Sequence, residues 1–147
     1  MKGTLSGIVL SFLLFTSLLQ AETERSQEFG NYIIYYNALP TEILQPDIAR
    51  QYGISRSKFR GFITLSVQEK TGDTSKPINA TIKADAVNLT GQQKTLSLRR
   101  VEEGPAIYYV DDFRIANEET LKFKLQIKPE NSQKNLSINF TQQFFTN

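Results

Sequence analysis

Apolar and polar side chains alternate at every second position along most of this chain, and this pattern constrains its fold more than any other feature. In one segment, for example, Ile78, Ala80, Ile82, Ala84 and Ala86 alternate with polar residues. Successive side chains of a strand point to opposite faces, so the pattern predicts strands with one buried and one solvated face. It recurs over residues 32–36, 58–68, 78–86, 95–99, 107–113, 121–128 and 136–144.

Strands of this kind bury their apolar faces by packing two sheets together or by closing a barrel. We expect an all-β, immunoglobulin-like antiparallel β-sandwich of about seven strands. A small up-and-down β-barrel is the alternative. One short helix is expected in the first connection, over residues 41–52, because Pro46 suits a first helical turn and Gly53 suits a stop. The chain has neither Cys nor Trp, so it is not an antibody-type domain.

Two residues do not fit the alternation. In the segment 58–68, Phe59, Gly61, Ile63, Leu65 and Val67 share the core parity, and Phe62 breaks the pattern as an aromatic on the outer parity. Asp111 has the opposite problem, since it shares the parity of the apolar residues around it. Burying a lone charge is costly, so we expect either an arginine partner or a local bulge that turns Asp111 outward.

The first 21 residues differ from the rest of the chain. A single basic residue, Lys2, precedes an apolar run over residues 5–19, and Ala21 stands before a polar stretch. This order is typical of a signal peptide, and the run is shorter than the roughly 20 residues of a membrane-spanning helix. We therefore expect a signal peptide over 1–21 and one domain over 22–147, with retention as an anchor as the alternative. Removing Lys2 leaves 16 basic and 15 acidic residues, a net charge of +1, so no nucleic-acid partner is indicated.

The missing residue types limit the chemistry of the chain. Without Cys and His it has no thiol nucleophile, no His-based triad and no His or Cys metal ligands. We expect no catalytic residues, no cofactor and no metal. A carboxylate-dependent glycan hydrolase remains an alternative, and it needs two carboxylates facing each other from different loops. A small-ligand carrier that uses a barrel interior is a further alternative.

Basic residues recur on the outward parity of two predicted strands. If these strands were neighbours, they would form a positive stripe able to meet anionic lipid, glycan or a partner protein. The predicted binding surface consists of Arg56, Lys58, Arg60, Phe62, Lys122 and Lys124.

Two short stretches are distinctive. They are Tyr36-Asn37-Ala38-Leu39-Pro40 and Tyr52-Gly53-Ile54-Ser55-Arg56-Ser57-Lys58. With them, the chain resembles a family of small exported Gram-negative proteins known only as a domain of unknown function. The resemblance implies a periplasmic location and transfers no activity. Together these features predict a non-catalytic periplasmic module that binds or assists an envelope protein or another envelope component.

Overall fold

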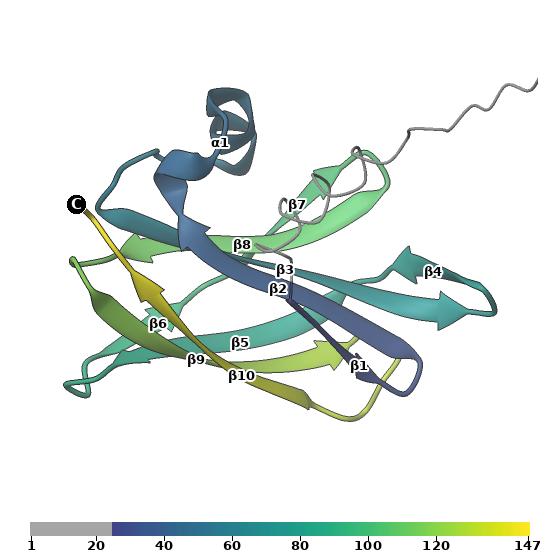
Figure 1. Cartoon of the computed structure of the whole chain (residues 1–147). Coiled ribbons are helices and arrows are strands. Elements are labelled where there is room, and N and C mark those ends of the chain that lie inside the picture. Colours follow the sequence, from purple (N-terminus) through teal and green to yellow (C-terminus); the bar gives the residue numbers. More distant parts are fainter. Residues whose placement is uncertain (1–24) are drawn as a thin grey trace, which may run out of the picture.

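The computed structural model describes residues 25–147, which form ten strands and two short helical segments (Figure 1). The predicted signal peptide lies outside these residues. The strands are β1 (Arg25–Phe29), β2 (Tyr32–Pro40), β3 (Arg60–Thr71), β4 (Thr74–Pro77), β5 (Ala80–Asn88), β6 (Gln93–Leu96), β7 (Arg99–Glu103), β8 (Ala106–Arg114), β9 (Glu119–Pro129) and β10 (Leu136–Phe144). A 3-10 turn η1 (Thr41–Ile43) and a helix α1 (Pro46–Tyr52) connect β2 to β3.

The strands form two antiparallel sheets that pack face to face. Sheet A has the order β1-β2-β3-β8-β7, and β4 pairs with the C-terminal end of β3. Sheet B has the order β10-β9-β5-β6. The predicted all-β sandwich is thus confirmed, and the sheets do not close into the alternative barrel. The predicted strand over 95–99 is two strands, because the chain leaves sheet B after Leu96 and enters sheet A at Arg99.

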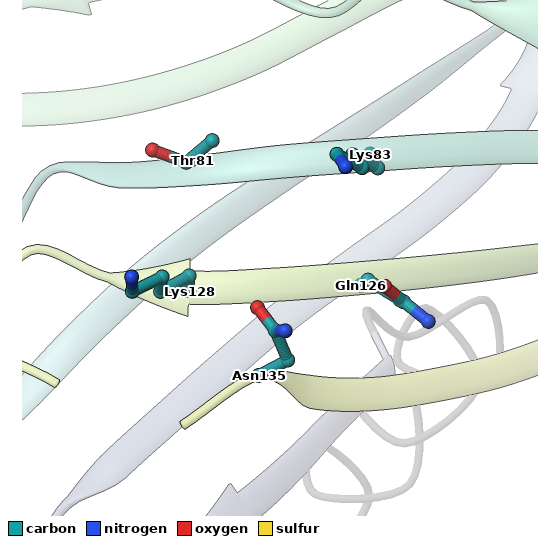
Figure 2. Close-up of a pocket in the computed structure, with 5 residues that line it drawn as sticks. All are labelled: Thr81, Lys83, Gln126, Lys128 and Asn135. Atoms are coloured by element: carbon teal, nitrogen blue, oxygen red, sulfur yellow. The ribbon is translucent and has the colours of Figure 1, made fainter. Parts of the chain in front are cut away.

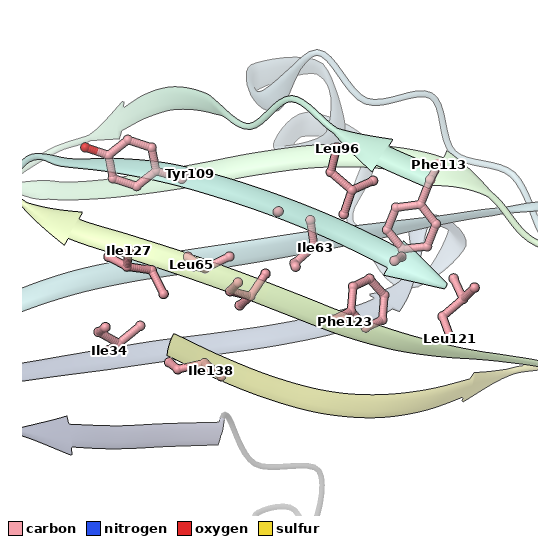
Figure 3. Packing of buried hydrophobic residues seen from close by; sticks show 14 of the residues in the cluster. Ile34, Ile63, Leu65, Leu96, Tyr109, Phe113, Leu121, Phe123, Ile127 and Ile138 are labelled. Carbon is pink, nitrogen blue, oxygen red and sulfur yellow. The ribbon is translucent and has the colours of Figure 1, made fainter. Parts of the chain in front are cut away.

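The core lies between the two sheets, where the predicted inward parities meet (Figure 3). Ile63, Leu65 and Val67 of β3 are at most 1% exposed, and so are Phe123 and Leu125 of β9. Alternation along each strand therefore translates directly into burial. Rings fill the end of the core where β8, β9 and β10 meet: the centroids of Phe113 and Phe123 lie 5.7 Å apart, as do those of Phe113 and Phe144.

Helix α1 lies on the outer face of sheet A (Figure 1), and this face carries a second group of buried apolar residues. Ala49 of α1, Ile54 behind it, Phe62 of β3 and Val110 of β8 are all buried, yet none belongs to the cluster between the sheets. Phe62 is 3% exposed, so the expectation of an outward, accessible aromatic is wrong. The alternation breaks at Phe62 because β3 has apolar contacts on both faces there.

The connection that carries α1 is fixed to sheet A by local hydrogen bonds. Buried Thr41 donates its hydroxyl to the carbonyl of Ser57 (2.9 Å) and accepts the Ser57 amide (2.8 Å). The helix begins with Pro46 and ends at Gly53, whose φ of 68° is accessible to glycine at little cost. Within residues 25–147 no helix has the length and apolar character needed to cross a membrane.

Candidate functional site

The structure separates the residues of the predicted binding surface. Arg56 and Lys58 are exposed in the loop before β3. Arg60 opens β3 and is held by Asp112 of β8, with Nε and Nη2 at 2.8 and 2.7 Å from Oδ2. Phe62 is buried under α1. Of the three basic residues near β3, Arg56 and Lys58 are therefore exposed, and Arg60 is held in an ion pair.

Lys122 and Lys124 lie elsewhere, because β9 belongs to sheet B and not to the sheet of β3. The predicted single stripe across both strands does not exist. The two lysines instead share the outer face of sheet B with Lys83 of β5 and with Lys128. We call these four residues the lysine face.

Two residues of the lysine face, Lys83 and Lys128, lie among polar side chains of β5, β9 and the start of β10 (Figure 2). Lys83 and Lys128 flank a hollow of about 240 Å³ that is completed by Thr81, Gln126 and Asn135. Asp85 sits directly opposite Lys124 on the neighbouring strand and offsets one charge. Exposed lysines on a sheet also prevent unwanted association, so this face needs no ligand to explain it.

A different surface gathers the exposed apolar side chains. Among residues 25–147, the large apolar residues with high exposure are Ile43 (55%), Phe59 (54%), Leu89 (71%) and Phe145 (56%). We call these four the apolar end. Phe59 has the parity of the core, but it lies just before β3 at the end of the sandwich, and its side chain is exposed.

Strand pairing places all four at the same end of the sandwich. The start of β3 pairs with the end of β8, the start of β9 with the end of β10, and the end of β5 lies beside the start of β9. The loops that follow or precede these strand ends carry Phe59, Phe145 and Leu89, and η1 follows the end of β2 at the same edge. Figure 1 shows the C-terminus, the β5–β6 hairpin and the α1–β3 connection together at this end.

Hydrogen bonds fix the loops of the apolar end to one another. The Ile115 amide donates to the carbonyl of Phe59 (2.9 Å), and the Thr146 amide donates to the Asn117 side chain (3.0 Å). Arg56 donates to the carbonyl of Glu42 (3.0 Å), which ties the β3 loop to η1. Hydrogen bonds thus hold in place the backbone segments that carry the exposed apolar side chains.

Basic groups surround the apolar end. The Lys58 ammonium lies 5.2 Å from the centre of the Phe59 ring, and Arg114 is exposed beside a hollow of about 350 Å³ that Phe59 also lines. Two exposed carboxylates, Glu42 and Glu118, lie at the same end. Arg56, Lys58 and Arg114 therefore lie among acidic groups, which also include the C-terminal carboxylate that follows Phe145. Aromatic and aliphatic tips with basic neighbours are the usual features of a surface that contacts a membrane interface.

A polar network on the outer face of sheet A has a structural role. Arg99 of β7 donates to the carbonyls of Tyr52 (2.8 Å) and Gly53 (3.2 Å) at the end of α1. The Tyr52 hydroxyl donates to Oε2 of Glu103 (2.7 Å). Partial burial and this carboxylate neighbour raise the pKa of Tyr52 above its ordinary value. The network holds α1 against β7.

The same network resolves the position of Asp111. Its Oδ2 accepts the Ser97 amide (2.8 Å), and its Oδ1 lies 3.6 Å from Nη1 of Arg99. Asp111 thus has the arginine partner expected for a carboxylate on the core parity. The contact with Ser97 also stabilises the corner where the chain crosses from sheet B to sheet A.

Together these features define a small all-β sandwich protein with a helix packed on one sheet and an exposed apolar end. The chain belongs to the DUF4426 family, a domain of unknown function. The match to this family covers residues 26–147. A solved structure of a DUF4426 family protein from Pseudomonas aeruginosa is 33% identical, with a TM-score of 0.74, and the match covers 85% of this chain and 97% of that chain.

More distant structures share the fold alone. FetP of uropathogenic Escherichia coli strain F11 is 11% identical with a TM-score of 0.60, over 82% of this chain and 93% of FetP. A copper-bound variant of FetP is 12% identical with a TM-score of 0.58, over the same shares of the two chains. None of the curated proteins matches this chain.

Proposed function

We propose that this protein is a non-catalytic periplasmic accessory module that docks on the anionic lipid surface of the cell envelope through its apolar end. The observation that carries the proposal is the grouping of Ile43, Phe59, Leu89 and Phe145 at one end of the sandwich. Monomeric proteins expose single apolar side chains at many places, but a group on a held framework is typical of a contact surface.

Charge supports a lipid partner. Arg56, Lys58 and Arg114 stand beside the apolar side chains, and a basic side chain near an anionic bilayer contributes about 1 kcal/mol. The apolar tips add to this by entering the headgroup region. Because acidic groups at the same end offset part of this attraction, we expect reversible attachment that weakens at high salt, not permanent insertion.

The periplasmic location is proposed from two sources. Residues 1–21 have the order of a signal peptide, and FetP was produced in the periplasm of Escherichia coli. Fractionation of cells producing the full chain, with mass spectrometry of its N-terminus, tests this part. A mature N-terminus at Glu22 in the periplasmic fraction supports it, and an intact chain in the cytoplasm contradicts it.

The copper of the FetP variant does not transfer to this chain. Protein copper sites are built from imidazole, thiolate and thioether groups, but this chain has no His, no Cys and Met1 as its single methionine. Among the described residues, no three acidic groups gather as a metal-binding cluster. We therefore propose no metal-dependent role.

We do not propose the hollows described above as catalytic sites. The two described above contain at most one carboxylate between them, that of Glu119, whereas a glycan hydrolase needs two facing carboxylates. The core between the sheets is filled by side chains, which leaves no barrel interior for a carried ligand.

Vesicle co-sedimentation tests the lipid partner. The mature chain, residues 22–147, should sediment with vesicles containing phosphatidylglycerol and much less with pure phosphatidylcholine. The variant Phe59→Ser/Leu89→Ser should bind about tenfold more weakly, since each lost apolar contact is worth about 1 kcal/mol or somewhat less at an interface. The matched variant Lys83→Gln/Lys128→Gln alters the lysine face and should bind almost normally. The reverse ranking of the two variants would contradict the proposed docking surface.

A further inference from the structure

The two sheets differ in width, and this leaves an open place beside β10. Sheet A is five strands across and sheet B is four. Phe140 of β10 packs against Tyr36 of β2, with ring centres 4.9 Å apart, and Arg25 of β1 lies over the same Phe140 ring at 4.9 Å. In Figure 3, β1 lies on the side of β10 away from β9. Sheet A therefore reaches past β10, and no described strand of sheet B lies beside β10 there.

The free edge of β10 is chemically unprotected. It is nine residues long and contains no charged residue, no Pro and no Gly. Proteins protect edge strands with charges, prolines or short length. The other strands with a free edge follow that rule: β6 has four residues including Lys94, β7 carries Arg99, Arg100, Glu102 and Glu103, β1 carries Arg25 and Glu28, and β4 ends with Lys76 and Pro77. Among the described strands, β10 is the exception.

The open place ends in an apolar hollow. It has a volume of about 340 Å³ and lies between the β1–β2 turn and the loop that precedes β10. Phe29, Tyr32 and Leu136 are the large apolar residues of its lining, and Lys134 provides a positive charge. At the other end of the open place, Arg25 donates to Oε1 of Gln142 (2.8 Å) and closes it. The edge of β10 thus has defined limits and a pocket at one of them.

We propose that β10 accepts an extended strand from a partner protein, which adds to sheet B as a fifth strand. Its backbone would pair with the free edge of β10, and an apolar side chain would enter the hollow. A carboxylate next to that side chain would meet Lys134. Backbone pairing with pockets for selected side chains is a common way to recognise an extended peptide.

The geometry favours a single strand over a second copy of this chain. The β1 arm runs along the same edge on the side of sheet A, from Arg25 near Gln142 to Phe29 near Leu136. A lone strand fits above this arm. If a second copy of the chain paired through its own β10, its sheet A would collide with β1. The free edge of β10 is a surface distinct from the apolar end, and strand addition there does not depend on lipid binding.

A synthetic peptide tests the proposal. The probe is a labelled nine-residue peptide of alternating Thr and Val, with Phe followed by Glu near one end. Fluorescence anisotropy should show saturable binding to the mature chain. Hydrogen exchange should show new protection of the outward amides of β10 only. A peptide methylated on the amides that face β10 should bind at least about tenfold more weakly, because each lost backbone hydrogen bond is worth about 1 kcal/mol.

Three results would overturn the proposal. The first is no binding, or equal binding of the methylated peptide. The second is protection at β6 or β7 in place of β10. The third is a dimer in analytical ultracentrifugation whose β10 amides are already protected without peptide, since the edge would then belong to a second copy. Because these tests use the unaltered protein, none depends on whether a variant folds.

Discussion

The hydroxyl of Tyr52 donates a 2.7 Å hydrogen bond to Oε2 of Glu103, and this contact joins helix α1 to strand β7. The carbonyl of Tyr52 also accepts from Arg99 of the same strand. The helix is seven residues long, too short to be stable alone. Its position therefore depends on these contacts and on the buried side chains beneath it.

Tyr52→Phe should remove the hydroxyl and keep the ring. The variant should lose about 1–2 kcal/mol of unfolding free energy, because the hydrogen bond to a carboxylate is lost. Urea denaturation at pH 7 checks the value. An unchanged midpoint would mean that the hydrogen bond contributes nothing to holding α1.

The same contact predicts a change at high pH. The pKa of Tyr52 is raised in the folded protein, so the native state holds this proton more tightly than the unfolded chain does. The stability that the folded protein gains from this raised pKa is fully present below the unfolded pKa of roughly 10. It is lost as the pH rises beyond that value. The stability difference between the wild type and Tyr52→Phe should therefore shrink above pH 10. A difference that grows in this range would contradict the sign.

Phe59 and Phe62 offer a matched pair of substitutions three residues apart. Phe62→Ala should cost about 3–5 kcal/mol, because it opens a cavity beneath α1. Phe59→Ala should change stability by less than about 0.5 kcal/mol, since its ring is exposed. Urea denaturation of both variants compares them directly. Similar losses would show that one of the two burial assignments is wrong.

Gly61→Ala should destabilise the protein through a steric clash. An added Cβ would lie 2.8 Å from Cε2 of Phe113 and 3.1 Å from Cε1 of Phe144. Two packed rings must then shift, at a cost of about 1–3 kcal/mol. Gly72→Ala is a useful comparison, since its Cβ meets no atom within 4 Å and the strain comes from φ of 66° alone. A stable Gly61→Ala variant with unchanged packing would contradict the close approach.

Asp111→Ala should weaken the corner between sheets B and A. The Ser97 amide would lose its acceptor and Arg99 one of its two acidic neighbours, which together should cost about 1–3 kcal/mol. Asp73→Ala, in the exposed β3–β4 turn, should be nearly neutral. Thermal unfolding of the two variants provides the comparison.

Alternation alone predicts most of this fold. Inward residues such as Leu65 and Phe123 follow directly from their parity, because a strand with one solvated face has a single way to bury them. Phe62 could not be placed in this way, since strand parity does not reveal that a helix covers the outer face of sheet A there. Phe59 shows the converse: its parity is that of the core, but it lies just beyond the paired part of β3.

The surfaces are less predictable from sequence than the core. Lys58 and Lys124 have the same outward parity, yet they belong to different sheets, and only the strand order reveals this. The apolar end joins residues from the β2–β3 connection, the β5–β6 hairpin and the C-terminal segment, and no local pattern connects Leu89 with Phe145. The open edge of β10 likewise depends on the unequal widths of the two sheets. The order of strands within a sheet is a tertiary property.

Contact between the apolar end and the bilayer can be measured directly. Because the sequence has no cysteine, Leu89→Cys at that end and Asp73→Cys at the opposite end can each carry one environment-sensitive dye. With phosphatidylglycerol vesicles, the dye at position 89 should shift to the blue and be quenched by nitroxide-labelled lipids, while the dye at position 73 should stay in water. Equal responses at both positions, or none at position 89 when the protein is vesicle-bound, would contradict the account.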